Sequence, residues 1–158
     1  MTLRAWRITK ARHAATAFSG GGAKANGGRW NSIGTAMVYC AGSTSLALLE
    51  MLVHLEALEL MKRYVSVQLA FDDSLVTTVD ITTLPKTWRR SPIPACVQAV
   101  GDRWVADSTS AILKAPSAIV PNEWNYLLNP GHSDFAKIAI EPKQPIKFDP
   151  RLLKATGT

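Results

Sequence analysis

The stretch Gly27-Gly28-Arg29-Trp30-Asn31 ends a run of small residues that begins at Phe18 and holds five of the ten glycines in the chain. Backbone N–H groups in such a loop are able to cradle a phosphate, although a flexible surface loop has the same composition. The run matches neither a P-loop nor a dinucleotide-binding fingerprint, because neither Gly-Lys-Ser/Thr nor G-x-G-x-x-G occurs in it. The forked guanidinium of Arg29 suits a diphosphate; a structural ion pair is the alternative.

The composition around this stretch is that of a globular protein. The chain has 158 residues, of which 47% are hydrophobic and 19% charged, so we expect one compact domain over residues 1–158. The formal net charge of +6 favours anionic partners, but the basic residues are spread along the chain and do not indicate direct nucleic-acid binding. Two cysteines give neither a disulfide framework nor a metal-ligand spacing. We see no membrane-spanning run and no signal peptide, and we expect a cytoplasmic protein.

Hydrophobic periodicity predicts the order of the elements. Strands are expected over residues 4–8, 37–41, 65–71, 76–81, 116–120 and 136–140. Helices are expected from residue 44 to about 63 and from residue 96 to about 113. Loops are expected over residues 18–28, 84–94 and 125–130. Many short strands with about two helices predict an α+β fold with a mostly antiparallel or mixed sheet and flanking helices.

Glu50 is the most informative single residue. A helical wheel places it among Leu46, Leu49 and Val53, on the face that we expect to be buried. Because an isolated buried carboxylate is costly, Glu50 needs a partner or a cleft, and Arg29 is the expected partner. A carboxylate in a cleft is able to orient a ribose hydroxyl and stabilise an oxocarbenium-like transition state. A buried structural Glu–Arg pair is the alternative.

Other polar residues are weaker candidates. Tyr39 lies in an expected strand, where its ring either stacks on a planar heterocycle or belongs to the core. A later polar set comprises Ser117, Asn125, Asn129 and His132, and it lacks the context of a nucleophile elbow. His54 and His132 are either proton shuttles or structural residues. No recurring ligand spacing predicts a metal site.

Several motifs together resemble RES-domain toxins, in order along nearly the whole chain. The early motifs are residues 27–31 (GGRWN), 38–41 (VYCA) and 47–50 (ALLE), and the later ones are residues 101–104 (GDRW), 116–118 (PSA), 125–130 (NYLLNP) with His132, and 148–152 (FDPRL). The Arg, Glu and Ser that give the family its name match Arg29, Glu50 and Ser117. Ser108 and Ser110 lie close before Ser117 and are the alternatives for the serine.

The resemblance implies a fold like that of ADP-ribosyltransferases and an enzyme that breaks the nicotinamide–ribose bond of NAD, by phosphorolysis or by hydrolysis. NAD is then a substrate, inorganic phosphate is a second substrate or is replaced by water, and no cofactor is needed. Arg29 would hold the diphosphate, Tyr39 would stack on nicotinamide or its ribose, and Glu50 would hold the ribose hydroxyl. Substrate or phosphate binding is expected for a further set, Gly28, Ser117, Asn129 and His132. The resemblance also implies an antitoxin partner that carries a helix-turn-helix DNA-binding domain and blocks the active site.

Two alternatives stay open at this point. An ADP-ribosyltransferase that modifies a protein or nucleic acid would use the same Arg29, Tyr39 and Glu50 and differ only in the acceptor. An RNA-directed toxin or binding module is permitted by the basic charge and the five tryptophans. However, no basic strand interleaved with aromatic residues resembles an RNA-binding platform.

Overall fold

A computed structural model of the chain describes residues 1–55, 59 and 62–152. Its centre is an eight-stranded sheet with the order β4-β5-β6-β2-β1-β3-β7, and β8 also pairs with β3. The strands are β1 (Thr2–Lys10), β2 (Val38–Ala41), β3 (Tyr64–Asp72), β4 (Val76–Thr78), β5 (Ile112–Pro116), β6 (Trp124–Leu128), β7 (Ala139–Ile140) and β8 (Gln144–Ile146). Only the β4–β5 pair is parallel, so the sheet is mixed.

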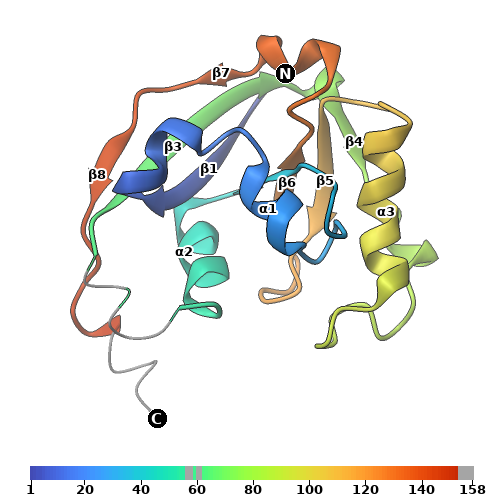
Figure 1. The fold of residues 1–158 in the computed structure, drawn as a ribbon, viewed down its shortest axis with the longest axis horizontal. Helices are drawn as coiled ribbons and strands as arrows, with labels where there is room; N and C mark the ends of the chain where they lie inside the picture. Colours follow the sequence, from blue (N-terminus) through green and yellow to red (C-terminus); the bar gives the residue numbers. More distant parts are fainter. Residues whose placement is uncertain (56–58, 60–61, 153–158) are drawn as a thin grey trace.

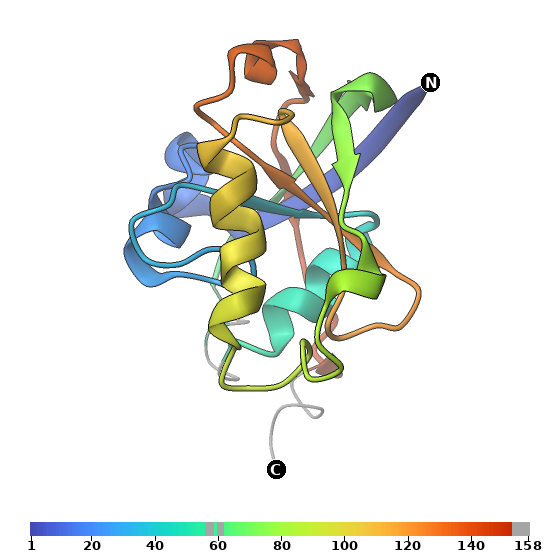
Figure 2. The same ribbon diagram turned by 90° about the vertical axis from the view of Figure 1, so that its right-hand side faces the viewer.

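The helices lie beside this curled sheet (Figure 1). The α-helices are α1 (Gly21–Asn26), α2 (Thr44–Leu52) and α3 (Ala95–Ala106). Short 3-10 turns complete the chain at η1 (Ala11–Thr16), η3 (Asp73–Leu75), η4 (Ile81–Thr83) and η5 (Ser133–Lys137). Figure 2 shows α3 running along the outside of the molecule, with α1 and its loop beside it. The predicted α+β class with a mixed sheet and flanking helices is therefore confirmed. Within the described part of the chain, no helix has the length and apolar character needed to cross a membrane.

Both predicted helices end earlier than expected. The side chain of Ser43 caps α2 by accepting from the N–H of Leu46, and the helix ends at Leu52 instead of residue 63. Residues 56–58, 60 and 61 of the predicted helix lie outside the described residues. Helix α3 ends at Ala106, because Ser108 adopts a left-handed backbone with φ 46° and the chain then turns into β5. The predicted helical extension to residue 113 is wrong.

Other boundaries differ for local reasons. The expected loop at 125–130 is mostly strand β6, whose buried residues pair with β2 on one side and β5 on the other. The glycine-rich run contains the short helix α1. The expected strand at 116–120 is wrong, since β5 ends at Pro116, and the strand at 76–81 shortens to β4. Residues 133–137 form η5, so that only Ala139–Ile140 pair with β3.

The glycine in the 101–104 motif fixes how α3 meets the stretch 27–31. A Cβ added to Gly101 would lie 1.8 Å from the carbonyl oxygen of Trp30, so only glycine lets the helix approach that closely. Trp30 packs there in a core cluster with Trp88, Val97 and Trp104. The carboxylate of Asp102 accepts from the Ser32 N–H at 2.9 Å and from its hydroxyl at 2.5 Å. Two motifs that lie some seventy residues apart in the sequence therefore form one packed unit.

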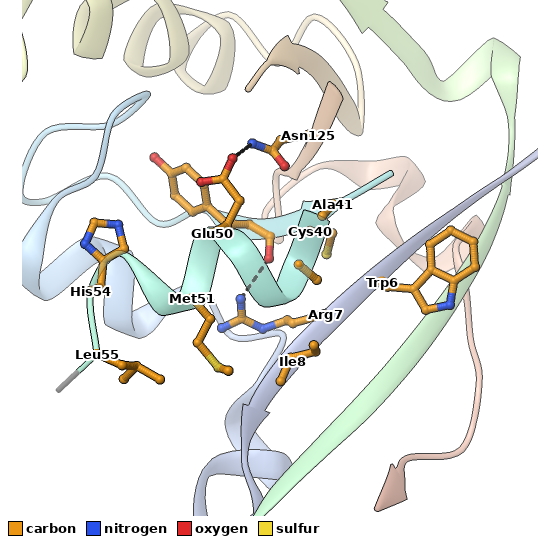
Figure 3. Close-up of a pocket in the computed structure, with 12 residues that line it drawn as sticks. Trp6, Arg7, Ile8, Cys40, Ala41, Glu50, Met51, His54, Leu55 and Asn125 are labelled. Carbon is orange, nitrogen blue, oxygen red and sulfur yellow. Dashed lines mark hydrogen bonds between the residues drawn. The ribbon is translucent and has the colours of Figure 1, made fainter. Parts of the chain in front are cut away.

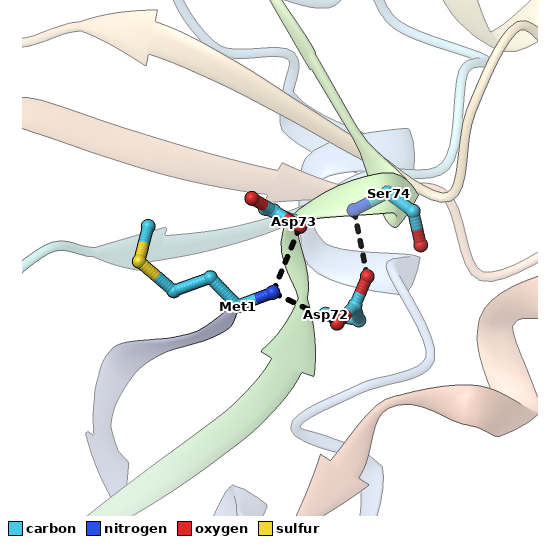
Figure 4. A network of polar contacts seen from close by, with 4 residues as sticks. All are labelled: Met1, Asp72, Asp73 and Ser74. Atoms are coloured by element: carbon cyan, nitrogen blue, oxygen red, sulfur yellow. Dashed lines mark hydrogen bonds and ion pairs between the residues drawn. The ribbon is translucent and has the colours of Figure 1, made fainter.

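A polar network holds the first residue against the end of β3 (Figure 4). The terminal amine of Met1 donates to Asp72 and Asp73, at 3.2 Å each. The Asp72 carboxylate also accepts from the backbone N–H of Ser74 at 3.0 Å and caps η3. Hydrogen bonds from Ser74, and then from the Met1 amine, lower the pKa of Asp72 to about 2.

Candidate active site

A forked cleft opens between α2, β2 and the loop that carries α1. Its main cavity has a volume of about 670 Å³ and is lined by the glycine-rich segment, Arg29, Trp30 and Ile119, among others. A side branch of about 280 Å³ extends between α2 and β1 (Figure 3). The two parts share the residues at their junction, which are Arg7, Tyr39, Glu50, His54 and Asn125.

Glu50 lies at this junction and is held by one of its two carboxylate oxygens. Its Oε1 accepts from the Ser117 hydroxyl at 2.7 Å and from the Asn125 side-chain amide at 2.7 Å (Figure 3 shows the Asn125 contact). Among the described residues, Oε2 accepts no hydrogen bond from protein. The half-buried carboxylate therefore has one oxygen fixed by protein donors and one oxygen left for a ligand.

The surroundings of Glu50 differ from those predicted. Leu46 is buried, but Leu49 and Val53 are 42% and 57% exposed, so Glu50 faces the cleft at the border between the buried and exposed sides of α2. The expected pair between Glu50 and Arg29 does not form, because no ion pair joins them in the described part of the chain. Glu50 instead bonds to two neutral donors, Ser117 and Asn125, where the sequence predicted a contact with Arg29.

Ser117 is the serine that reaches Glu50, and its position follows the end of β5. The side chain is 1% exposed. Its hydroxyl accepts from the backbone N–H groups of Ile119 and Val120 at 3.1 Å each, while its own hydrogen is donated to Glu50. The hydroxyl hydrogen of Ser117 is therefore not available to a phosphate. The geometry indicates that Ser117 positions Glu50 and does not make the expected phosphate contact. Of the two alternatives, Ser110 instead bonds to Trp104 and Ile112.

Tyr39 lies with its ring against the cleft and its hydroxyl turned into the protein. The hydroxyl donates to the side-chain oxygen of Asn31 at 2.6 Å and accepts from the N–H of Trp30 at 3.0 Å. Burial raises the pKa of Tyr39 well above its ordinary value. A Cβ on Gly28 would lie 2.6 Å from this hydroxyl, so Gly28 is needed for the contact. The ring remains available to a ligand, whereas the hydroxyl belongs to the fold.

Arg29 lines the main cavity and is anchored by one nitrogen. Its Nη1 donates to the carbonyl oxygens of Trp88 at 2.7 Å and Arg90 at 3.2 Å. Burial lowers the pKa of Arg29, while the charge of Glu50 acts in the opposite direction. Since only Nη1 is used within the described residues, the remaining guanidinium nitrogens are free to meet an anion in the cavity.

From the sequence alone, neither Arg7 nor Asn125 is predicted to have a role in the site. Arg7 projects from β1 to the junction, and its Nη1 donates to the carbonyl oxygen of Tyr39 at 2.8 Å (Figure 3). Its Nε is buried with no hydrogen-bond partner among the described residues, and no described carboxylate forms an ion pair with the guanidinium. The sequence feature that could have identified Arg7 is the presence of a charged residue inside the strand predicted over residues 4–8. Asn125 was noted only as a member of the later polar set.

The structure does not bring Asn129 and His132 to the cleft. Asn129 is buried past the end of β6, where its side-chain oxygen accepts from the N–H of Gly131. The His132 ring caps η5 through Asp134 and meets the carbonyl of Ser108 at 3.1 Å. Both residues shape a turn, and neither lines the cavity or its side branch. No group of three or more metal-binding side chains occurs in the ranges that the structure describes.

Comparisons with known proteins agree with the sequence motifs. The RES domain family matches residues 4–149. A protein named Toxin Res from Yersinia enterocolitica is 38% identical over 149 residues, which cover 93% of this chain and 97% of that protein. A protein named Prs ADP-ribosylating toxin, from a Sphingobium strain, is 39% identical over 160 residues, covering 98% of this chain and 99% of that protein.

A solved structure supports the fold. The crystal structure of the MbcT–MbcA toxin–antitoxin complex of M. tuberculosis contains a chain that aligns with all of this one and 91% of its own length, with a TM-score of 0.75. The sequence identity is 18%, so the likeness is one of fold.

Proposed function

This chain belongs to the RES domain family, and from that premise we propose that it is the toxin of a toxin–antitoxin pair and that it destroys NAD by breaking the nicotinamide–ribose bond. The strongest support for the proposal is the way in which the carboxylate of Glu50 is held in the cleft. Its Oε1 is fixed by Ser117 and Asn125, and its Oε2 faces a cleft of about 670 Å³. A carboxylate held in this way suits a reaction in which positive charge develops on a sugar.

The reaction needs little more than orientation and electrostatic stabilisation. When the bond between C1′ of the ribose and the pyridinium nitrogen breaks, its electron pair goes to nicotinamide, which leaves as a neutral molecule. The sugar becomes oxocarbenium-like, and the negative charge of Glu50 stabilises it while Oε2 accepts from a ribose hydroxyl. Water or inorganic phosphate then attacks C1′.

The remaining groups suit the rest of the NAD molecule. Arg29 and Arg7 supply two cations that form no ion pair with a described carboxylate, and a diphosphate is an anion that matches forked guanidinium donors. The ring of Tyr39 offers a flat surface to nicotinamide or its ribose. The backbone of the glycine-rich segment, including Gly28, lines the same cavity, where its N–H groups are able to bind phosphate oxygens.

The test is to incubate the purified chain with NAD, with and without inorganic phosphate, and to identify the products by mass spectrometry. We expect nicotinamide with ADP-ribose when water is the acceptor, and nicotinamide with phosphorylated ADP-ribose when phosphate is. NAD that stays intact under both conditions, with the protein folded by circular dichroism, would refute the proposal.

We propose an antitoxin with a helix-turn-helix DNA-binding domain as the partner, acting in the cytoplasm where NAD is available. The exposed Val53 lines the main cavity, so an apolar segment of the antitoxin has a contact beside Glu50. Addition of the cognate antitoxin should suppress nicotinamide release. Undiminished release in the presence of bound antitoxin would count against blockage of the cleft.

A second candidate is ADP-ribosyl transfer to a macromolecule, which the name of the Sphingobium relative favours. The same cleft would release nicotinamide, but a nucleophile of a protein or nucleic acid would attack C1′. Cell extract incubated with NAD labelled in the adenine ring separates the two functions. Label retained on macromolecules supports transfer, whereas label found only in small products supports NAD destruction.

A further inference from the structure

The side branch of the cleft is apolar, in contrast to the main cavity. Beyond the shared junction it is lined by residues such as Trp6, Ile8, Ala47, Met51 and Leu55. Figure 3 shows Ile8, Met51 and Leu55 gathered between β1 and α2, beside the Arg7 guanidinium. None of the described residues that line only this branch is charged, so these walls suit a neutral ring better than an ion.

Among the described residues that line the branch, the charged ones are Glu50 and Arg7, and both lie at the junction. A pyridinium ring entering the branch would lose water against apolar walls, which disfavours its charge. At the junction, the charges of Glu50 and Arg7 act on the ring in opposite directions. Loss of the C1′–N bond removes the ring's charge and, with it, the cost of desolvation. The branch therefore favours neutral nicotinamide over the pyridinium form, and it retains a pyridine base next to the carbon that Glu50 stabilises.

We infer that this branch binds neutral pyridine bases and that the protein has a second activity, the exchange of the base of NAD. This inference rests on the proposed cleavage of NAD. A free base in the branch donates its nitrogen lone pair to C1′ and forms a new C1′–N bond, while the departing nicotinamide keeps the electron pair of the broken bond. One pyridinium replaces another, so the step needs neither a proton nor an oxidant.

The experiment supplies NAD with an excess of deuterated nicotinamide and follows both the consumption of NAD and the mass of the NAD that remains. We expect deuterium to enter NAD while hydrolysis or phosphorolysis proceeds. A second base, acetylpyridine, should give the corresponding acetylpyridine dinucleotide.

The outcomes separate this inference from the proposed function. NAD that is consumed without gaining deuterium, even at saturating base, would overturn base exchange and leave NAD cleavage standing. NAD that is neither consumed nor labelled would overturn both. Labelled NAD in the presence of the wild-type chain, and none without it, supports the inference.

Variants that fill the side branch test whether base exchange takes place there. Ala47→Leu fills it from α2, and we expect the ratio of exchange to cleavage to fall by about tenfold or more. Met51→Phe narrows the same branch from the next turn of α2, and it replaces Ala47→Leu in the experiment if that variant does not fold. Leu49→Phe is the matched control, because Leu49 is on the same helix, is 42% exposed and lines neither part of the cleft. An unchanged ratio in folded Ala47→Leu and Met51→Phe would place the exchange elsewhere.

Discussion

The hydroxyl of Ser117 donates to Oε1 of Glu50 at 2.7 Å, although 67 positions separate the two residues in the chain. The contact joins α2 to the turn that follows β5, and Asn125 on β6 adds a second donor to the same oxygen. Because both donors are neutral, they orient the carboxylate without cancelling its charge. Glu50 thus enters the cleft as a fixed anion.

Loss of either donor should slow the reaction more than it weakens substrate binding. In Ser117→Ala or Asn125→Ala the Glu50 side chain is free to rotate, and a displacement of about 1 Å costs up to about 100-fold in rate. We therefore expect kcat to fall by about 10 to 100-fold with little change in KM. Steady-state kinetics of nicotinamide release measure both values, and melting curves verify the fold. An unchanged kcat in both variants would mean that the two hydrogen bonds do not position the carboxylate for catalysis.

The close approach of α3 to Trp30 should make Gly101 indispensable. A methyl group there would lie 1.8 Å from the Trp30 carbonyl oxygen, so Gly101→Ala must push the helix away, at a cost of about 3 kcal/mol. Gly22→Ala is the control, since a Cβ on Gly22 meets nothing within 4 Å and we expect its effect to stay within about 1 kcal/mol. Urea unfolding gives both values. Equal stabilities of the two variants would contradict the packing described.

Glu50 illustrates what the sequence is able to predict about the site. A helical wheel needs only local geometry, and it places Glu50 on an inward side of the helix. It does not name the partner, because Ser117 and Asn125 arrive from strands whose pairing depends on the whole sheet. Arg29 was the expected partner on charge alone, yet the fold ties its Nη1 to two backbone carbonyls. Arg7 was not selected for a similar reason, since only strand pairing brings it beside Tyr39.

The errors in the elements have local causes. The segment 125–130 contains two asparagines and a proline, a composition typical of loops, but residues 125–128 lie in β6 because their backbone pairs with β2 and β5 on either side. The sequence predicts that the helix starting at Thr44 continues to about residue 63, because no glycine or proline marks the end that α2 has at Leu52. Strands with clean alternation, such as β3, were predicted to within one residue at each end.

The capping carboxylate of Asp72 should contribute to stability only above acid pH. Its pKa is lowered from 3.8 to about 2 in the folded protein, so its contribution is present above its ordinary pKa and is lost as the pH falls through that range toward 2. We expect Asp72→Asn to lower Tm at about pH 7 and to reduce the further loss of Tm on going to about pH 3. Thermal melts of the two proteins at both pH values give the comparison. Parallel decreases in Tm would show that Asp72 does not act in this way.

The two cysteines should differ sharply in reactivity. Cys40 is 4% exposed, and burial raises the pKa of its thiol to about 12, whereas Cys96 is exposed. Since the thiolate is the reactive form, iodoacetamide at mildly alkaline pH should alkylate Cys96 in the folded protein and both residues after denaturation. Mass spectrometry of peptides reports the sites. Rapid alkylation of Cys40 in the folded chain would mean that the core around β2 opens readily.

The role of Glu50 as a fixed anion is tested most directly by comparing nicotinamide release from NAD by the wild-type chain and by Glu50→Gln. Glutamine retains the shape of the side chain and removes the charge, so we expect a folded protein of similar Tm whose kcat is lower by at least about 100-fold. We expect rapid release by the wild-type chain and almost none by the variant. Equal release by a folded Glu50→Gln would contradict the claim that a fixed anion at this position drives the loss of nicotinamide.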